Sequence, residues 1–246
     1  MNTQCLVAIL TYNNGDDLQH LLARISVDFP YDLIVHVDGS TDGSDAILEK
    51  YPYRVLRQQK NVGVGKSIRN VFKYAADNQY EAIAILPGNN KNDPAEIERL
   101  LKPIIEDRAD YVQGSRYLKG SRRDHTPLFR LIMVKVHATM LSLLVHRRIT
   151  DALEGFLAIK LSILDDPAID VEQDWLNTYG LETYLFYKVT ADKKYRYLEV
   201  PVSKIYPENK KSLLNKGGIK YSHIRPFVDW WHILKPIFYL VLKIRE

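Results

Sequence analysis

A short apolar run that breaks sharply into a polar loop is the feature that most constrains the fold of this chain. The run extends from Ala82 to Leu86 and ends at Pro87-Gly88. It shows no alternation of apolar and polar residues, which is typical of a strand covered on both faces of a parallel sheet. Asp93 and Pro94 then provide a cap and a first-turn proline for a new helix. Ligands of open α/β sheets bind at such strand ends, so this loop is a candidate site. The alternative is a plain turn that needs Gly88 only for its backbone.

The same succession of strand, polar loop and helix recurs through the first half of the chain. Apolar runs at 6–10, 33–37 and 55–56 predict three further strands. Each is followed by a loop rich in Gly, Asn, Asp or Ser and then by a helical pattern, at 18–25, 46–50 and 66–76. This repetition predicts a parallel sheet with right-handed crossovers, and hence an α/β fold. Further on, helices are expected at 128–145 and 172–187 and a strand at 195–202.

Bulk composition excludes several classes of protein. A length of 246 residues fits one domain with one core. Cys5 is the single cysteine, which excludes an internal disulfide and suits a reducing compartment. The net charge of +4 comes from 34 basic and 30 acidic residues, so it gives no argument for nucleic acid as a partner. Neither a secretory signal nor an apolar run long enough to span a membrane is expected.

Common catalytic motifs are not complete in this sequence. Gly63-Val64-Gly65-Lys66-Ser67 resembles the end of a Walker loop, but the first glycine of that motif would have to stand at Lys60. No Gly-x-Gly-x-x-Gly occurs, because residue 68 is Ile. The seven histidines have no metal-ligand spacing, and no Gly-x-Ser-x-Gly is present. Hydrolase and dehydrogenase functions therefore lose their best support.

Seven short motifs instead follow one another in the order seen in family 2 glycosyltransferases. They are Thr11-Tyr12-Asn13, Val37 to Gly43, Asn61-x-Gly63, Asp93-Pro94, Gly114-Ser115-Arg116-Tyr117, Asp151-x-x-x-Gly155-Phe156 and Glu199-Val200-Pro201. On these residues the chain most resembles the polyprenyl-phosphate branch, which is similar to dolichol-phosphate mannose synthases, over roughly residues 5 to 206. The resemblance implies a GT-A fold, with a Rossmann-like, mostly parallel sheet flanked by helices. It also implies a nucleotide-diphosphate sugar as donor and inversion of the anomeric centre.

The resemblance places the donor at the ends of the first strands. The donor-binding residues that it implies are Thr11, Tyr12, Asn13, Asp38, Lys66, Asn89 and Lys91. Asp38 is expected to accept hydrogen bonds from the base or the ribose. A turn or cap aspartate is the alternative for this residue.

The largest departure from the family lies in the loop after the apolar run. The family has Asp-x-Asp where this chain has Pro87, Gly88 and Asn89. Three interpretations remain open. A Mg or Mn ion could be held weakly by Asn89, Asp93, water and the diphosphate. Lys91 could instead place positive charge on the leaving diphosphate, or the protein could bind nucleotide sugar without catalysis. The weakly held metal ranks first among these expectations.

Arginines and acids in the middle of the chain are the expected acceptor and catalytic groups. The resemblance implies that Arg116 and Arg130 bind an acceptor phosphate, and their forked guanidinium donors suit phosphate geometry. A solvated arginine on a helix face is the alternative for Arg130. If the acceptor is a hydroxyl, Asp151 or Glu154 is the candidate base. A phosphate acceptor arrives ionised and needs no base. The expected catalytic residues are therefore Asp151, Glu154 and Arg116.

The remaining expectations concern the membrane and the C-terminal part. The sequence is divided into a catalytic domain at 1–206 and a basic loop with an amphipathic tail at 207–246. The segment 204–225 is a candidate lid or a solvated basic surface. The helix at 128–145 and the tail at 226–246 are each expected either to pack on the domain or to lie at a membrane interface.

Together these expectations describe a peripheral enzyme at the cytoplasmic face of a membrane that uses a lipid-linked acceptor. A homodimer is a further expectation. The acceptor is either a polyprenyl phosphate or a hydroxyl of a lipid-linked glycan. The alternative function is an inactive nucleotide-sugar binding or assembly subunit.

Overall fold

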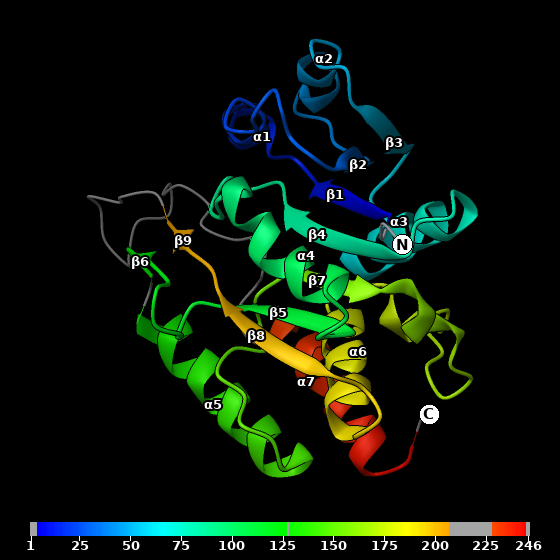
Figure 1. Ribbon diagram of the computed structural model, residues 1–246, viewed down its shortest axis with the longest axis vertical. Coiled ribbons are helices and arrows are strands. Elements are labelled where there is room, and N and C mark those ends of the chain that lie inside the picture. Colours follow the sequence, from blue (N-terminus) through cyan, green and yellow to red (C-terminus); the bar gives the residue numbers. More distant parts are fainter. Residues whose placement is uncertain (1–3, 127, 207–227, 245–246) are drawn as a thin grey trace.

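Seven strands form one sheet in the computed structural model of the chain, which describes residues 4–126, 128–206 and 228–244 (Figure 1). Their order across the sheet is β3-β2-β1-β4-β7-β5-β8. The bounds are β1 Cys5–Thr11, β2 Asp32–Asp38, β3 Arg54–Gln58, β4 Ala82–Pro87, β5 Tyr111–Ser115, β7 Leu157–Lys160 and β8 Tyr197–Pro201. Two short strands, β6 Arg123–Asp124 and β9 Lys204–Ile205, pair separately. The expected α/β class with a mostly parallel sheet is confirmed.

The helices follow the predicted alternation with one clear exception. The α-helices are α1 Gly15–Leu22, α2 Ser44–Leu48, α3 Val64–Asp77, α4 Ile97–Ile105, α5 Leu128–Val145, α6 Gly180–Ala191 and α7 Val228–Val241, and the 3₁₀ turns are η1 Pro94–Glu96, η2 Leu161–Asp165 and η3 Asp174–Leu176. The prediction of one helix over 172–187 is wrong. The backbone carbonyl of Asn177 accepts a hydrogen bond from the Lys66 N–H at 3.1 Å, so this carbonyl serves the start of α3 rather than a helix of its own.

One strand of the sheet, β7, runs against the others. It pairs antiparallel with both β4 and β5, whereas the remaining neighbours are parallel. The segment that leads into β7 therefore arrives at the same edge where β1, β2, β4 and β5 end. No local pattern in the sequence predicts this strand or its direction.

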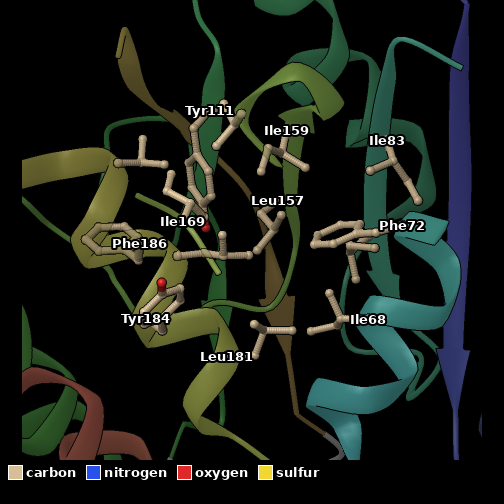
Figure 2. Close-up of a cluster of buried hydrophobic side chains, with 14 of the residues drawn as sticks. Ile68, Phe72, Ile83, Tyr111, Leu157, Ile159, Ile169, Leu181, Tyr184 and Phe186 are labelled. Atoms are coloured by element: carbon tan, nitrogen blue, oxygen red, sulfur yellow. The ribbon is translucent and has the colours of Figure 1, made fainter. Parts of the chain in front are cut away.

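Apolar layers cover both faces of the sheet. On one face, α3, α5, α6 and α7 contribute to a core that includes Phe72, Leu157 and Phe186. Figure 2 shows Ile68 and Phe72 of α3 pointing toward Leu157 on β7, with α6 on the other side. On the opposite face, α1, α2 and α4 pack their leucines and isoleucines against the sheet. Burial of both faces explains why Ala82 to Leu86 carries no polar alternation.

The ends of β1 and β4 approach each other closely because residue 88 is glycine. The Gly88 N–H donates to the Leu10 carbonyl at 2.8 Å. A β-carbon at position 88 would lie only 2.8 Å from that same carbonyl oxygen. Glycine is therefore required at position 88, because the backbone of the loop after β4 lies directly against the end of β1.

The C-terminal helix α7 packs on α6 through one face. Ile233 and Ile237 are buried, and the Pro236 ring lies where a side chain at Gly180 would stand. Trp231 and Phe238 on the other face are about half exposed. None of the described helices is long and apolar enough to cross a membrane. Lys210, Lys211, Lys216, Lys220 and Arg225 of the expected lid lie outside the described residues, and the division at residue 206 stays a prediction.

Candidate active site

The loops after β1 and β2 are tied together by short hydrogen bonds. The Asn13 carboxamide oxygen accepts from the Thr41 N–H at 2.8 Å, and the Asn13 N–H donates to the Ser40 hydroxyl at 3.0 Å. The Asp42 carboxylate accepts from the Gly15 N–H at 2.7 Å. Asn13 adopts a left-handed backbone conformation with φ of 49°, which asparagine tolerates better than most residues. These contacts hold the expected donor loops side by side.

Asp38 organises a third loop. Its two carboxylate oxygens accept from the backbone N–H groups of Val62 and Gly63, at 2.8 and 3.1 Å. The side chain is 5% exposed. Asp38 therefore fixes the loop that precedes α3, which agrees with the alternative that this residue is a turn aspartate. Its expected contact with a base or ribose stays a prediction.

Two other expected donor residues differ in their surroundings. The Thr11 hydroxyl is buried and has no hydrogen-bond partner among the described residues, so it could accept a ligand at the end of β1. Lys66, in the first turn of α3, is partly exposed, and its ammonium lies 3.9 Å from the Glu172 carboxylate. Tyr12 is half-buried beside Thr11. The structure thus places all three near the loops held by Asp38 and Asn13.

A buried ion-paired centre joins the end of β5 to the segment before β7. Arg116 and Asp151 are 1% and 0% exposed. The Arg116 Nε and Nη2 atoms donate to the two oxygens of Asp151 at 2.6 and 2.8 Å, a bidentate pair. The Glu154 Oε2 atom lies 3.2 Å from Arg116 Nε. The three expected catalytic residues are therefore brought together, and the buried carboxylates raise the pKa of Arg116 against the opposing effect of burial.

Glu199 on β8 positions this centre, a role that the sequence did not reveal. Its Oε1 atom accepts from the Thr150 and Asp151 N–H groups at 2.9 and 3.0 Å, and its Oε2 atom accepts from the Thr150 hydroxyl at 2.9 Å. Burial raises the pKa of Glu199, although these hydrogen bonds oppose the rise. The Glu199-Val200-Pro201 motif was the only sequence signal for this contact.

Lys204 is a second residue of the site that sequence reasoning missed. It was expected at the start of a mobile or solvated basic loop, and the structure corrects this for Lys204, which is 6% exposed. Its ammonium donates to Glu154 Oε1 at 2.7 Å. The Asn92 amide also donates to that oxygen, at 3.2 Å. No local pattern marks Lys204 as buried, because its partner lies 50 residues earlier in the chain.

Cationic side chains gather around the ring of Tyr206. The Lys91 ammonium lies 5.2 Å from the ring centroid and the Arg130 guanidinium 5.9 Å. Burial, together with the nearby positive charges of Lys204 and Arg130, lowers the pKa of Lys91 to about 8. Tyr206 directly follows β9, and the expected donor residue Lys91 and the expected acceptor residue Arg130 both lie beside its ring.

A small pocket of about 50 Å³ lies beside this centre, between α6 and the segment before β7. Its lining includes Arg130, Glu154, Tyr179 and Glu182. Burial raises the pKa of Glu182 to about 7, with Lys204 opposing and Glu154 adding to the rise. A side chain at Gly155 would meet the Glu182 carboxylate at 3.0 Å.

The expected metal ligands have other partners in the structure. The Asn89 carboxamide oxygen accepts from the Lys91 N–H at 3.4 Å. Asp93 lies 3.1 Å from the Arg24 guanidinium and caps η1 by accepting from the Ala95 N–H at 3.1 Å. Within the described ranges, no three His, Cys, Asp or Glu side chains are grouped to hold a metal ion. A metal at Asn89 and Asp93 stays a prediction, and these contacts do not favour it.

All of these residues lie at one edge of the sheet. Thr11, Asp38 and the loop from Pro87 follow the carboxyl ends of parallel strands, and Arg116 follows the end of β5. Asp151 and Glu154 reach the same edge because β7 is antiparallel. This is the edge at which open α/β sheets bind ligands.

Comparison with known proteins identifies the family. A model described as glycosyl transferase family 2 matches residues 6–194. A dolichol-phosphate mannosyltransferase of Pyrococcus furiosus is 26% identical over 236 residues, which cover 91% of this chain and 63% of that protein. A polyprenol monophosphomannose synthase of Mycolicibacterium smegmatis is 28% identical over 167 residues, which cover 65% of this chain and 63% of that protein. The chain thus spans less than two thirds of the length of these relatives.

Solved structures agree on the fold. A glucosyl-3-phosphoglycerate synthase from Mycobacterium tuberculosis, in complex with Mn²⁺, UDP and glucosyl-3-phosphoglycerate, superposes with a TM-score of 0.57 at 17% identity, covering 82% of this chain and 70% of that one. At this identity the likeness shows the GT-A architecture. With the family model matching most of its length, this chain belongs to glycosyl transferase family 2.

Proposed function

We propose that this protein transfers a sugar, with inversion, from a nucleotide-diphosphate donor to a lipid-linked acceptor. The observation that carries the proposal is the meeting of two sets of residues at one sheet edge. The donor loops of β1 and β2 stand on one side, and the Arg116–Asp151 centre with its neighbouring cations stands on the other. The names of the relatives, which refer to dolichol phosphate and polyprenol, support a lipid-linked acceptor.

The contacts of the acids favour a phosphate over a hydroxyl acceptor. Both oxygens of Asp151 accept from Arg116, and Glu154 accepts from Lys204 and Asn92. If either carboxylate took a proton from an acceptor hydroxyl, the ion pairs that hold it in place would be disrupted, so these contacts suit a positioning role better than the role of a base. A phosphate arrives ionised and needs cations such as Arg130 rather than a base.

We propose that the protein works at the cytoplasmic face of a membrane, and the apolar side chains that two helices expose support contact with a membrane surface. Leu128, Ile132 and Val136 of α5 are 71%, 53% and 57% exposed and lie at helical spacing on one face. On α7, Trp231 and Phe238 stack at 6.0 Å, with Lys235 and Lys243 on the same helix or directly after it. Exposed aromatics with lysines suit the membrane interface. A second copy of the chain is the alternative occupant of these faces.

Two measurements test this function. Purified protein should transfer label from one member of a panel of nucleotide sugars to short polyprenyl phosphate, and it should float with anionic vesicles. The variant Trp231→Ser with Phe238→Ser should float less, while Val27→Ser, which changes a fully exposed apolar residue elsewhere, should float like the parent protein. Transfer to a glycan hydroxyl but not to the phosphate would refute the acceptor assignment. Dimerisation without flotation would refute the membrane assignment.

The alternative is an inactive subunit that binds nucleotide sugar. The replacement of the Asp-x-Asp positions by Pro87, Gly88 and Asn89 favours it. Slow hydrolysis of the donor by the purified protein would exclude this alternative, and binding without hydrolysis or transfer would support it.

A further inference from the structure

The loop after β4 is joined to the segment around β9 by backbone pairing. The Ile205 N–H donates to the Lys91 carbonyl at 2.8 Å, and Asn92 and Lys204 form an antiparallel bridge. Strand β9 is held in turn by Glu96, whose carboxylate accepts from the Ser203 N–H at 2.6 Å. This pairing carries Lys204 and Tyr206 to the loop that holds Asn89 and Lys91.

Four cations converge at this junction. Arg116 and Lys204 are buried, and Lys91 and Arg130 flank the Tyr206 ring at 5.2 and 5.9 Å. The facing carboxylates are those of Asp151 and Glu154 at the centre, Glu182 in the pocket and Asp17 near Lys91. At Lys91 the positive charges of Lys204 and Arg130 disfavour a further charge, and an anion bound beside these side chains would offset that repulsion.

A buried hydroxyl without a partner points to the same place. Tyr206 is 1% exposed, and its hydroxyl has no hydrogen-bond partner among the described residues. A buried hydroxyl normally finds a partner because leaving it unsatisfied is costly. A phosphate oxygen would accept a hydrogen bond from the Tyr206 hydroxyl.

The same loop fits a divalent cation poorly. Pro87 and Gly88 have no side-chain ligand atoms, and Asp93 is paired with Arg24 and caps η1. Asn89 would offer one neutral oxygen, whereas Mg²⁺ in proteins is bound through one or two carboxylates together with phosphates and water. The positions that carry acids in the family therefore lack the donor set, and cations stand next to them.

We infer that Lys91, Lys204 and the Tyr206 hydroxyl form a phosphate-binding site for the donor diphosphate, which then binds without a divalent cation, while Arg130 stays with the acceptor phosphate. The inference rests on the proposed function. In the transfer, the bond between the anomeric carbon and the diphosphate oxygen breaks, and its electron pair stays on that oxygen. The acceptor oxygen forms the new bond to the same carbon. The cationic site stabilises the charge that develops on the leaving diphosphate.

Calorimetry with UDP and GDP, and with the corresponding monophosphates, tests the site. At least one diphosphate should bind equally well, within about twofold, in excess chelator and in Mn²⁺. Lys91→Met should lower the affinity for the diphosphate by about tenfold or more, since a hydrogen bond to a charged group is worth roughly 1.5–3 kcal/mol. The affinity for the monophosphate should fall less. Tyr206→Phe should weaken the diphosphate by a smaller factor. Lys73→Met, which removes an exposed lysine of α3, is the matched control and should bind like the parent protein.

Lys204 needs a charge-balanced variant because removing it alone takes away one of the two cationic partners of the buried Glu154 carboxylate. Lys204→Met with Glu154→Gln keeps the balance, and its fold is verified by circular dichroism. Diphosphate binding that is lost in chelator and restored by Mn²⁺ would overturn the inference while leaving the proposed function intact. Diphosphate affinity unchanged in Lys91→Met and in the folded double variant would also overturn it. If no nucleotide binds under either condition, the proposed donor fails and the site fails with it.

Discussion

Replacing Glu182 by Gln should make the folded protein less sensitive to pH between about 5.5 and 8.5. Glu182 lies on α6 beside the pocket before β7, and burial raises its pKa from 4.5 to about 7. The unfolded chain releases this proton near pH 4.5 and the folded chain only near pH 7. Between these values the folded state binds more protons, so its stability falls as pH rises. Above pH 7 both states are ionised and the loss is complete.

The magnitude follows from the pKa values. One pH unit of differential protonation corresponds to roughly 1.4 kcal/mol. From pH 5.5 to the folded pKa of about 7, the parent protein should lose about 2 kcal/mol of unfolding free energy through this group. The variant Glu182→Gln keeps the size of the side chain and carries no titrating proton, so this part of the pH dependence should vanish.

Urea denaturation of both proteins at pH 5.5 and pH 8.5 measures the effect. The difference in unfolding free energy between variant and parent should shift by about 2 kcal/mol in favour of the variant at the higher pH. Glu98→Gln on the exposed face of α4 is the control, and its difference from the parent should not depend on pH in this range. Equal differences for Glu182→Gln at both pH values would refute the raised pKa and the burial from which it derives.

Three further substitutions have outcomes set by the site geometry. Arg116→Met leaves Asp151 buried without its bidentate partner and should lower the unfolding free energy by about 3–5 kcal/mol. Urea denaturation measures this, and a loss below about 1 kcal/mol would contradict a buried pair. Asp38→Ala removes the carboxylate that holds the loop before α3. Calorimetry should show a lower nucleotide affinity, with an unchanged far-ultraviolet circular dichroism spectrum, and an unchanged affinity would remove Asp38 from the donor site. Gly88→Ala forces a β-carbon against the Leu10 carbonyl and should lower the melting temperature, and a neutral effect would show that the loop can move.

The points at which strands end in loops could be predicted from the sequence because they depend on neighbouring residues in the chain. Ala82 to Leu86 is apolar throughout, and Pro87-Gly88 can only end such a strand. The first three helices and α5 were predicted close to their observed bounds for the same reason, since the spacing of apolar residues fixes which face is buried. The helix expected over 172–187 failed where a tertiary hydrogen bond to Lys66 competed with helical bonding.

The sequence by itself determined the α/β class and the loops at the strand ends, and its ordered motifs predicted that Arg116, Asp151 and Glu154 come together, as the structure shows. Only the tertiary structure decided which of these groups pair with each other. The direction of β7 brings Asp151 to Arg116, and the pairing of β9 with the loop after β4 buries Lys204 against Glu154. Such partners lie 35 and 50 residues apart. Local propensity and spacing carry no information about a contact that forms only when distant strands share a sheet edge.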